Sequence, residues 1–311
     1  MKDIAASILA RLKNQAKETG LSYQMCLQLF CQEEFLRRLS LSQYSSNFVL
    51  KGGLFIYTLT EFQSRATQDI DFLMRQLSND IDKVKEIMKE ISQISTANDY
   101  IAIEVVNAET ITPDKEYQGV SVKFIGRIKQ VRIPFSIDVG MDDVIVPKAV
   151  KRSLKTRLKN FDAPEIYTYS LESTIAEKFD AILKRMEATS RMKDFFDIYY
   201  LSSMYDFDGR KLQEAVWQTI QHRGTVYEAN SFDRIATFGN NSFLSAQWTR
   251  FQPSMQVQLP KFAFVLYRLK EFLQPVFEAS IQEREFFMDW SAEQKKWQEQ
   301  GGKKNDGSQL I

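Results

Sequence analysis

The first residues of this chain that could carry out chemistry are two aspartates separated by one residue, Asp69 and Asp71. Residues 69–74 alternate acidic and apolar positions before becoming apolar, which predicts a strand, and residues two apart on a strand share a face. Two adjacent carboxylates repel each other unless a cation neutralises them, and Mg²⁺ takes carboxylates together with substrate phosphate oxygens. The pair is a candidate magnesium site for a nucleotide, although a lone pair of this kind more often faces solvent.

Two glycines lie upstream of the aspartates, between an expected strand and an expected helix. Gly52 and Gly53 would let the backbone approach a ligand closely, and the free N–H groups at the start of a helix can bind an anion. We therefore expect a phosphate site here beside Lys51, with Arg65 and Thr67 as further phosphate or ribose contacts. The alternative is an ordinary strand-to-helix turn, which Arg65 and Thr67 would stabilise.

A third acid, Asp138, lies between apolar residues on a predicted strand. A charged side chain is poorly placed there unless it has a partner or a metal. In two-metal phosphoryl transfer, a further carboxylate binds the metal that activates the attacking hydroxyl. Asp138 is therefore expected to complete the metal site.

A predicted helix over 170–186 carries Lys178 and Arg185, which lie two turns apart and so share a face. A lysine that reaches a triphosphate is a common way to balance its charge, and the alternative for both residues is a solvated helix face. Asp194 and Asp197 follow on the next predicted helix. Either acid could position Lys178, orient the nucleotide, or only cap the helix and pair with nearby basic side chains.

The elements that must position these residues indicate an α+β chain with a helical C-terminal part. Apolar spacing predicts two helices within 1–41 and further helices over 80–95, 170–186, 192–204, 209–222 and 261–288. Period-two alternation predicts strands over 100–107, 118–126 and 131–139, in addition to short strands at 48–50 and 69–74. The segment 223–255 is rich in Asn, Ser and Gly and is expected to be a loop. We expect N-terminal helices plus an α/β core over 1–150, a mostly helical domain over 151–299, and a disordered tail over 300–311.

Charge gives no overall nucleic-acid signature, because the 311 residues include 41 Lys and Arg against 40 Asp and Glu. Six basic residues do fall within 148–159 with no acid among them. This run is expected to be a solvated linker face, or else a contact for phosphate.

The few cysteine and histidine residues exclude some kinds of site. Cys26 and Cys31 are not spaced like a zinc pair or a redox motif, so both are expected to be buried thiols. His222 is the single histidine, which excludes a multi-histidine metal site. No signal peptide and no apolar run of membrane-spanning length is visible, so we expect a cytoplasmic protein with no membrane partner.

Four segments, in this order, resemble the AbiEii/AbiGii family of type IV toxins. They are FVLKGGLFIYTL at 48–59, SRATQDIDFLM at 64–74, FSIDVG at 135–140 and ESTIAEKFDAILKRMEATSRMKDFFDIYYL at 172–201. The family consists of nucleotidyltransferases with a DNA polymerase β-like fold, which form the toxin half of abortive-infection toxin–antitoxin pairs. The resemblance therefore implies a polymerase β-like core with a mixed sheet, preceded by N-terminal helices and followed by a helical domain.

The resemblance also implies a reaction, in which a nucleoside monophosphate passes from an NTP to an acceptor, an RNA such as the 3′ end of a tRNA. It places the Mg²⁺ ligands of a two-metal site on Asp69, Asp71 and Asp138, the helical lysine on Lys178 and a further acid on Asp194. An antitoxin encoded nearby is the implied protein partner. Two residues depart from the common pattern, since many enzymes of this fold have Ser where Gly53 stands and Arg where Lys193 stands.

Two other functions remain open from the residues themselves. One is a non-catalytic protein that binds a nucleotide or a partner, and the other is a kinase-like phosphotransferase that uses the same general site.

Overall fold

The structure of the chain is a computed structural model, which describes residues 3–111, 119–251 and 258–300. These residues form two compact units, of which the first runs to Ser170 and the second begins at Leu171. We expected a boundary at residue 150, but the sheet of the first unit takes in two later strands, β6 (Val150–Ser153) and β7 (Glu165–Thr168). From residue 301 on, the expected disordered tail lies outside the described residues.

A seven-stranded sheet is the frame of the first unit, with the order β3-β4-β5-β2-β1-β7-β6. Its other strands are β1 (Phe48–Lys51), β2 (Ile70–Met74), β3 (Ile101–Ile111), β4 (Gly119–Ile128) and β5 (Val131–Gly140). The pairs β2–β5 and β1–β7 are parallel and the others are antiparallel. The expectation of an α+β chain with a mixed sheet is therefore confirmed.

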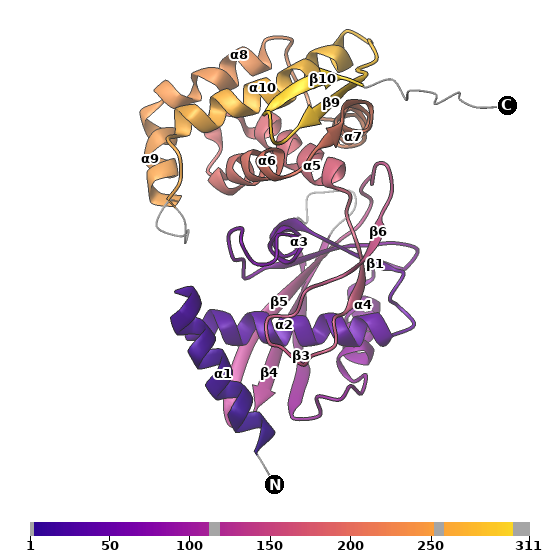
Figure 1. Cartoon of the computed structure of the whole chain (residues 1–311). Coiled ribbons are helices and arrows are strands. Elements are labelled where there is room, and N and C mark those ends of the chain that lie inside the picture. The colour runs from indigo at the N-terminus through magenta and orange to yellow at the C-terminus, as the bar shows by residue number, and fades with distance from the viewer. Residues whose placement is uncertain (1–2, 112–118, 252–257, 301–311) are drawn as a thin grey trace, which may run out of the picture. The chain divides into compact units, whose positions relative to one another are not determined.

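Four helices accompany this sheet, and Figure 1 shows α1 and α2 next to each other alongside it. They are α1 (Ile4–Thr19), α2 (Tyr23–Leu41), α3 (Gly52–Leu59) and α4 (Ile81–Ser92). Gly20 ends α1 in the left-handed conformation at φ 71°, which glycine adopts without strain. Ser22 begins α2 by accepting a hydrogen bond from the Met25 N–H at 3.1 Å. These two caps fix where the chain turns from α1 into α2.

Helix α2 carries ionised side chains into the interior, where they form a closed network around Glu34. The Glu34 carboxylate is fully buried and accepts hydrogen bonds from Arg37 at 2.8 Å and from Arg38 at 3.2 Å. It also accepts hydrogen bonds from Thr96 at 2.6 Å and Asn98 at 2.7 Å, in the loop that precedes β3. Buried charges are tolerated only when they are paired and hydrogen-bonded, so this network joins α2 to the start of β3.

The second unit consists of helices and a small sheet, in which α10 lies beside the hairpin β9–β10 (Figure 1). Its helices are α5 (Leu171–Arg185), α6 (Met192–Met204), α7 (Gly209–His222), α8 (Ser231–Ala236), α9 (Ser242–Phe251) and α10 (Phe262–Ile281). Two short 3₁₀ helices cover Met186–Ala188 and Thr237–Asn240. The strands are β8 (Phe207–Asp208), β9 (Met288–Ser291) and β10 (Lys296–Glu299).

Two expectations for this unit were wrong. The segment 223–255 is no continuous loop, because α8 and α9 lie within it and bury apolar residues such as Phe232 and Trp248. The helix expected over 261–288 ends at Ile281, and its last expected residue begins β9 instead.

Both cysteines are buried free thiols, as expected. Burial raises the pKa of the Cys31 thiol to about 12 and also raises the pKa of the Cys26 thiol. Within the described ranges, no helix has the combined length and apolar character that crossing a membrane requires.

The Glu34 network yields a stability prediction. Glu34→Gln removes the charge that two buried guanidinium groups share, so we expect the free energy of unfolding to fall by about 3–5 kcal/mol. Glu86→Gln, at an exposed position on α4, is the matched control and is expected to change it by less than about 0.5 kcal/mol. Urea denaturation of the full chain measures both, and equal stability of the two variants would show that the network contributes little.

Candidate active site

Four neighbouring strands of the first unit each place one residue in a single row across the sheet. Ser121 on β4 lies opposite Asp138 on β5, Asp138 lies beside Asp71 on β2, and Asp71 lies opposite Lys51 on β1. Residues paired in this way point to the same face, with Cβ atoms about 4.5–5.5 Å apart. The two acids that the sequence singled out separately are therefore neighbours, flanked by a hydroxyl on one side and an amine-bearing residue on the other.

The glycine turn lies directly beside this row. Gly52 begins α3 with φ 68°, and a Cβ atom added to it would stand 2.1 Å from the Asp71 Oδ2 atom. A Cβ on Gly53 would stand 3.1 Å from Thr67 and 3.3 Å from the Arg65 guanidinium. The start of α3 is thus in close contact with the Asp71 carboxylate and with the segment that precedes the acids, and glycine at position 52 is required by both space and φ.

Lys51 is held by an acid that the sequence analysis missed. Its Nζ atom lies 3.1 Å from Asp143 Oδ2 and 5.2 Å from the centre of the Tyr169 ring. The Asp143 side chain is nearly buried, with 8% of it exposed. The available signal was weak, since Asp143 lies after β5 in a segment that has no strand alternation of its own. Lys51 therefore stands at the turn with its charge partly balanced.

The remaining two acids of the expected metal site differ in environment. Asp138 is half-buried, and its Oδ1 atom accepts a hydrogen bond from the Ser121 hydroxyl at 2.6 Å. Asp69 is exposed and lies one residue before β2, outside the strand on which we expected it. Its backbone N–H donates to the Thr67 hydroxyl at 3.3 Å. Sequence reasoning also missed Ser121, whose signal is a serine between two valines in an otherwise apolar stretch.

The carboxylate oxygens in the row are the type of ligand that a hard divalent cation prefers. Asp71 and Asp138 supply carboxylate oxygens from directly paired positions, and Asp69 lies just before them on the chain. Over the part of the chain that the structure describes, no three His, Cys, Asp or Glu side chains are grouped to hold a metal by themselves. The three acids expected to bind the metal therefore do not form such a group, and the paired Asp71 and Asp138 are the two carboxylates that could hold an ion. Mg²⁺ can bind through one or two carboxylates and complete its shell with water and substrate phosphates.

A second cluster of predicted residues lies in the second unit. The Lys178 ammonium lies 2.6 Å from Asp197 and 3.3 Å from Asp194, and Arg191 reaches the other oxygen of Asp194 at 2.6 Å. Lys178 is 8% exposed, while Asp194 and Asp197 are almost completely buried. Both acids therefore hold the lysine, so the geometry makes Asp197 as strong a candidate as Asp194.

Two other singled-out residues lie at the surface of this unit. Arg185, two turns along α5 from the buried lysine, is exposed, and its guanidinium lies 3.5 Å from the Ala181 carbonyl. His222 is exposed at the end of α7.

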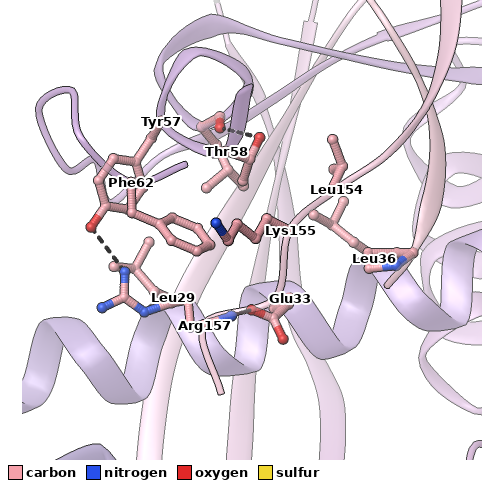
Figure 2. A pocket seen from close by; sticks show the side chains of 11 residues that line it. Leu29, Glu33, Leu36, Tyr57, Thr58, Phe62, Leu154, Lys155 and Arg157 are labelled. Atoms are coloured by element: carbon pink, nitrogen blue, oxygen red, sulfur yellow. Dashed lines mark hydrogen bonds between the residues drawn. The ribbon is translucent and has the colours of Figure 1, made fainter. Parts of the chain in front are cut away.

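The basic run at 148–159 lies within the first unit, where its four lysines are exposed and one of its arginines is buried. Arg157 is buried and donates a hydrogen bond to the Tyr57 hydroxyl at 2.9 Å, at one end of a pocket between α2 and α3 (Figure 2). Lys155 lines the same pocket and pairs with Glu61. The run looked free because its partners come from distant parts of the sequence.

Comparison with known proteins supports a nucleotidyltransferase fold. A family model described as nucleotidyl transferase AbiEii toxin, type IV toxin–antitoxin system, matches residues 34–282. Among solved structures, the nucleotidyltransferase toxin MenT4 from Mycobacterium tuberculosis is 14% identical, covers 88% of this chain and 99% of its own, and gives a TM-score of 0.52. JHP933 from Helicobacter pylori is 12% identical over 84% of this chain and 95% of its own, with a TM-score of 0.47. No curated protein sequence matches. Because the matched residues make up well over half of it, the chain belongs to the AbiEii family of nucleotidyl transferase toxins of type IV toxin–antitoxin systems.

Proposed function

We propose that this chain transfers a nucleoside monophosphate from an NTP to an acceptor hydroxyl of an RNA, such as the 3′ end of a tRNA, and releases pyrophosphate. The observation that carries the proposal is the pairing of Asp71 with Asp138 beside the Gly52 turn. Membership of a toxin family implies a nucleotide substrate and a cognate antitoxin. We propose an abortive-infection role, with the antitoxin encoded nearby.

The turn supplies the groups that would bind the triphosphate. The first N–H groups of α3 are free of helical hydrogen bonds, and the Lys51 side chain does not cap them. Arg65 and Thr67 lie against Gly53 at the same helix end. Free N–H groups, two cationic side chains and a hydroxyl around one helix N-terminus provide a suitable site for phosphate oxygens.

The acids supply the metal-binding side of the same site. Asp71 and Asp138, with Asp69, are the residues that would hold Mg²⁺, in the two-metal arrangement that we propose. When bound, the ions neutralise phosphate charge and favour ionisation of the acceptor hydroxyl. Asp138 would also help to orient that hydroxyl, because its own carboxylate is fixed by a hydrogen bond to Ser121.

Lys178 is proposed as the cation that balances negative charge developing on the nucleotide. Its two buried acids, Asp194 and Asp197, hold the ammonium in one place and are proposed as its positioning residues. Arg185, exposed on the same helix, is proposed as a weaker phosphate contact.

The first prediction of this proposal concerns the acids. Asp71→Ala, Asp138→Ala and Asp69→Ala should each lower the rate of RNA labelling by about 10²–10³-fold or more, because each removes a ligand of the catalytic cation. The measurement is transfer of label from [α-³²P]NTP to RNA in the presence of Mg²⁺, with Asp82→Ala on α4 as an exposed-acid control. EDTA should abolish the transfer.

Several outcomes would contradict this assignment. Full labelling by Asp69→Ala and Asp71→Ala would show that the metal assignment is wrong. Release of a nucleoside diphosphate instead of pyrophosphate would identify a kinase-like phosphotransferase. Calorimetric binding of NTP without turnover on any candidate RNA would identify a binding protein.

The second prediction separates contact from backbone strain at the glycine turn. Gly52→Ala drives a methyl group into the Asp71 carboxylate, so it should abolish labelling. Gly20→Ala is the matched control, since Gly20 has φ 71° and no atom within 4 Å of the added Cβ. Both variants should lose about 1–2 kcal/mol of stability from the left-handed conformation, measured by urea denaturation. Equal activity of the two variants would argue against a role for the turn.

The third prediction separates charge balance from folding at Lys178. Lys178→Met leaves buried carboxylates short of a partner and should cost about 3–5 kcal/mol of stability. Lys178→Met/Asp197→Asn should regain part of that stability while remaining inactive in RNA labelling. Asp197→Asn alone shows how much activity the acid itself supplies. Recovery of activity along with stability in the double variant would show that Lys178 is structural.

A further inference from the structure

Ser121 is a polar residue at a strand position where its neighbours are apolar. Val120 and Val122 on either side are buried in the core, and Ser121 itself is only 7% exposed. A buried hydroxyl needs a hydrogen-bond partner, and the partner of Ser121 is the Asp138 carboxylate at 2.6 Å. A bond of this length between a hydroxyl and a carboxylate is in the strong, charge-assisted range.

The sheet register fixes where this bond lies relative to the other acid. Ser121 and Asp71 pair with Asp138 from opposite sides, on β4 and β2. The hydrogen bond from Ser121 holds the Asp138 Oδ1 atom on the β4 side. The Asp138 Oδ2 atom can therefore face β2, the strand that carries Asp71. A bond between two paired strands holds its geometry more rigidly than one from a loop.

We propose that Ser121 is a positioning residue, whose hydroxyl fixes the Asp138 carboxylate so that Asp138 and Asp71 bind one divalent cation together. The inference rests on the proposed function and adds to it a residue that acts through Asp138. The hydroxyl takes no part in bond making or breaking, and loss of it should weaken cation binding even before any nucleotide is present.

The test compares Ser121→Ala, which removes the donor, with Ser121→Thr, which keeps it. Binding of Mn²⁺ to the full chain without nucleotide is measured by electron paramagnetic resonance, and kcat is measured by RNA labelling. Ser121→Ala should weaken Mn²⁺ binding and lower kcat by about 10–100-fold each, as is usual when a hydrogen-bond partner of a metal ligand is removed. Ser121→Thr should restore most of both. Lys123→Ala, on the same strand and face in a half-exposed ion pair with Glu109, should change neither.

Asp138→Ala distinguishes a failure of the positioning role of Ser121 from a failure of the proposed function. If Asp138→Ala is inactive while Ser121→Ala binds Mn²⁺ and turns over like the unaltered chain, the positioning role is overturned and the proposed function stands. If Asp138→Ala keeps its activity, the assignment of Asp138 fails, and the inference fails with it. The melting temperatures of both variants are also measured. If Ser121→Ala melts at a lower temperature, and Ser121→Thr is stable but binds Mn²⁺ as weakly and turns over as slowly as Ser121→Ala, the role of the hydroxyl is also overturned.

Discussion

The register of β2 between β5 and β1 is the constraint on which the rest of the candidate site depends. A strand alternates its side chains between two faces, so a slip of one residue would turn Asp71 to the opposite face. Ile70 and Phe72 prevent that slip, because both are completely buried and a slip would expose them. The same alternation on β5 buries Ile137 and leaves Asp138 half-exposed. The geometry of the acids is therefore set by apolar residues that are completely buried.

Helix α2 supports this register from the apolar side of the sheet. It packs against β5, and Phe35 meets Phe124 of the neighbouring β4 edge to face at 5.4 Å. The Glu34 network on the same helix then fixes α2 against the loop before β3. Replacing a buried ionic network by apolar residues often costs a protein no stability, so a network of this kind contributes most by specifying a single packing arrangement. Here that arrangement places the helix against the strands that carry the row.

The sequence predicted features that depend on local pattern and missed those that depend on strand pairing. The apolar spacing identified α1, α2 and α4. Ser121 and Asp143 could not be found in this way, because their roles arise from partners on other strands. The helices α8 and α9 were hidden because Asn and Ser residues favour helix caps as well as turns. Arg157 appeared to be a surface charge because its partner Tyr57 lies far away in the sequence.

The charges gathered at the row explain why a nucleotide would need a cation there. The site holds three carboxylates, those of Asp71, Asp138 and Asp143, and one ammonium, that of Lys51. Their formal charges add up to −2. A triphosphate brought to the adjacent glycine turn would meet repulsion from these acids, and at short range in a partly buried site such repulsion is several times stronger than in water. The first ion of the proposed two-metal arrangement would balance the formal charge of these four side chains. It would also leave the helix N-terminus of α3 as a favourable place for the phosphates. The spacing of acids and glycines along the chain thus places carboxylates beside the turn, and in the proposed site neutralising those carboxylates would favour a triphosphate at the turn.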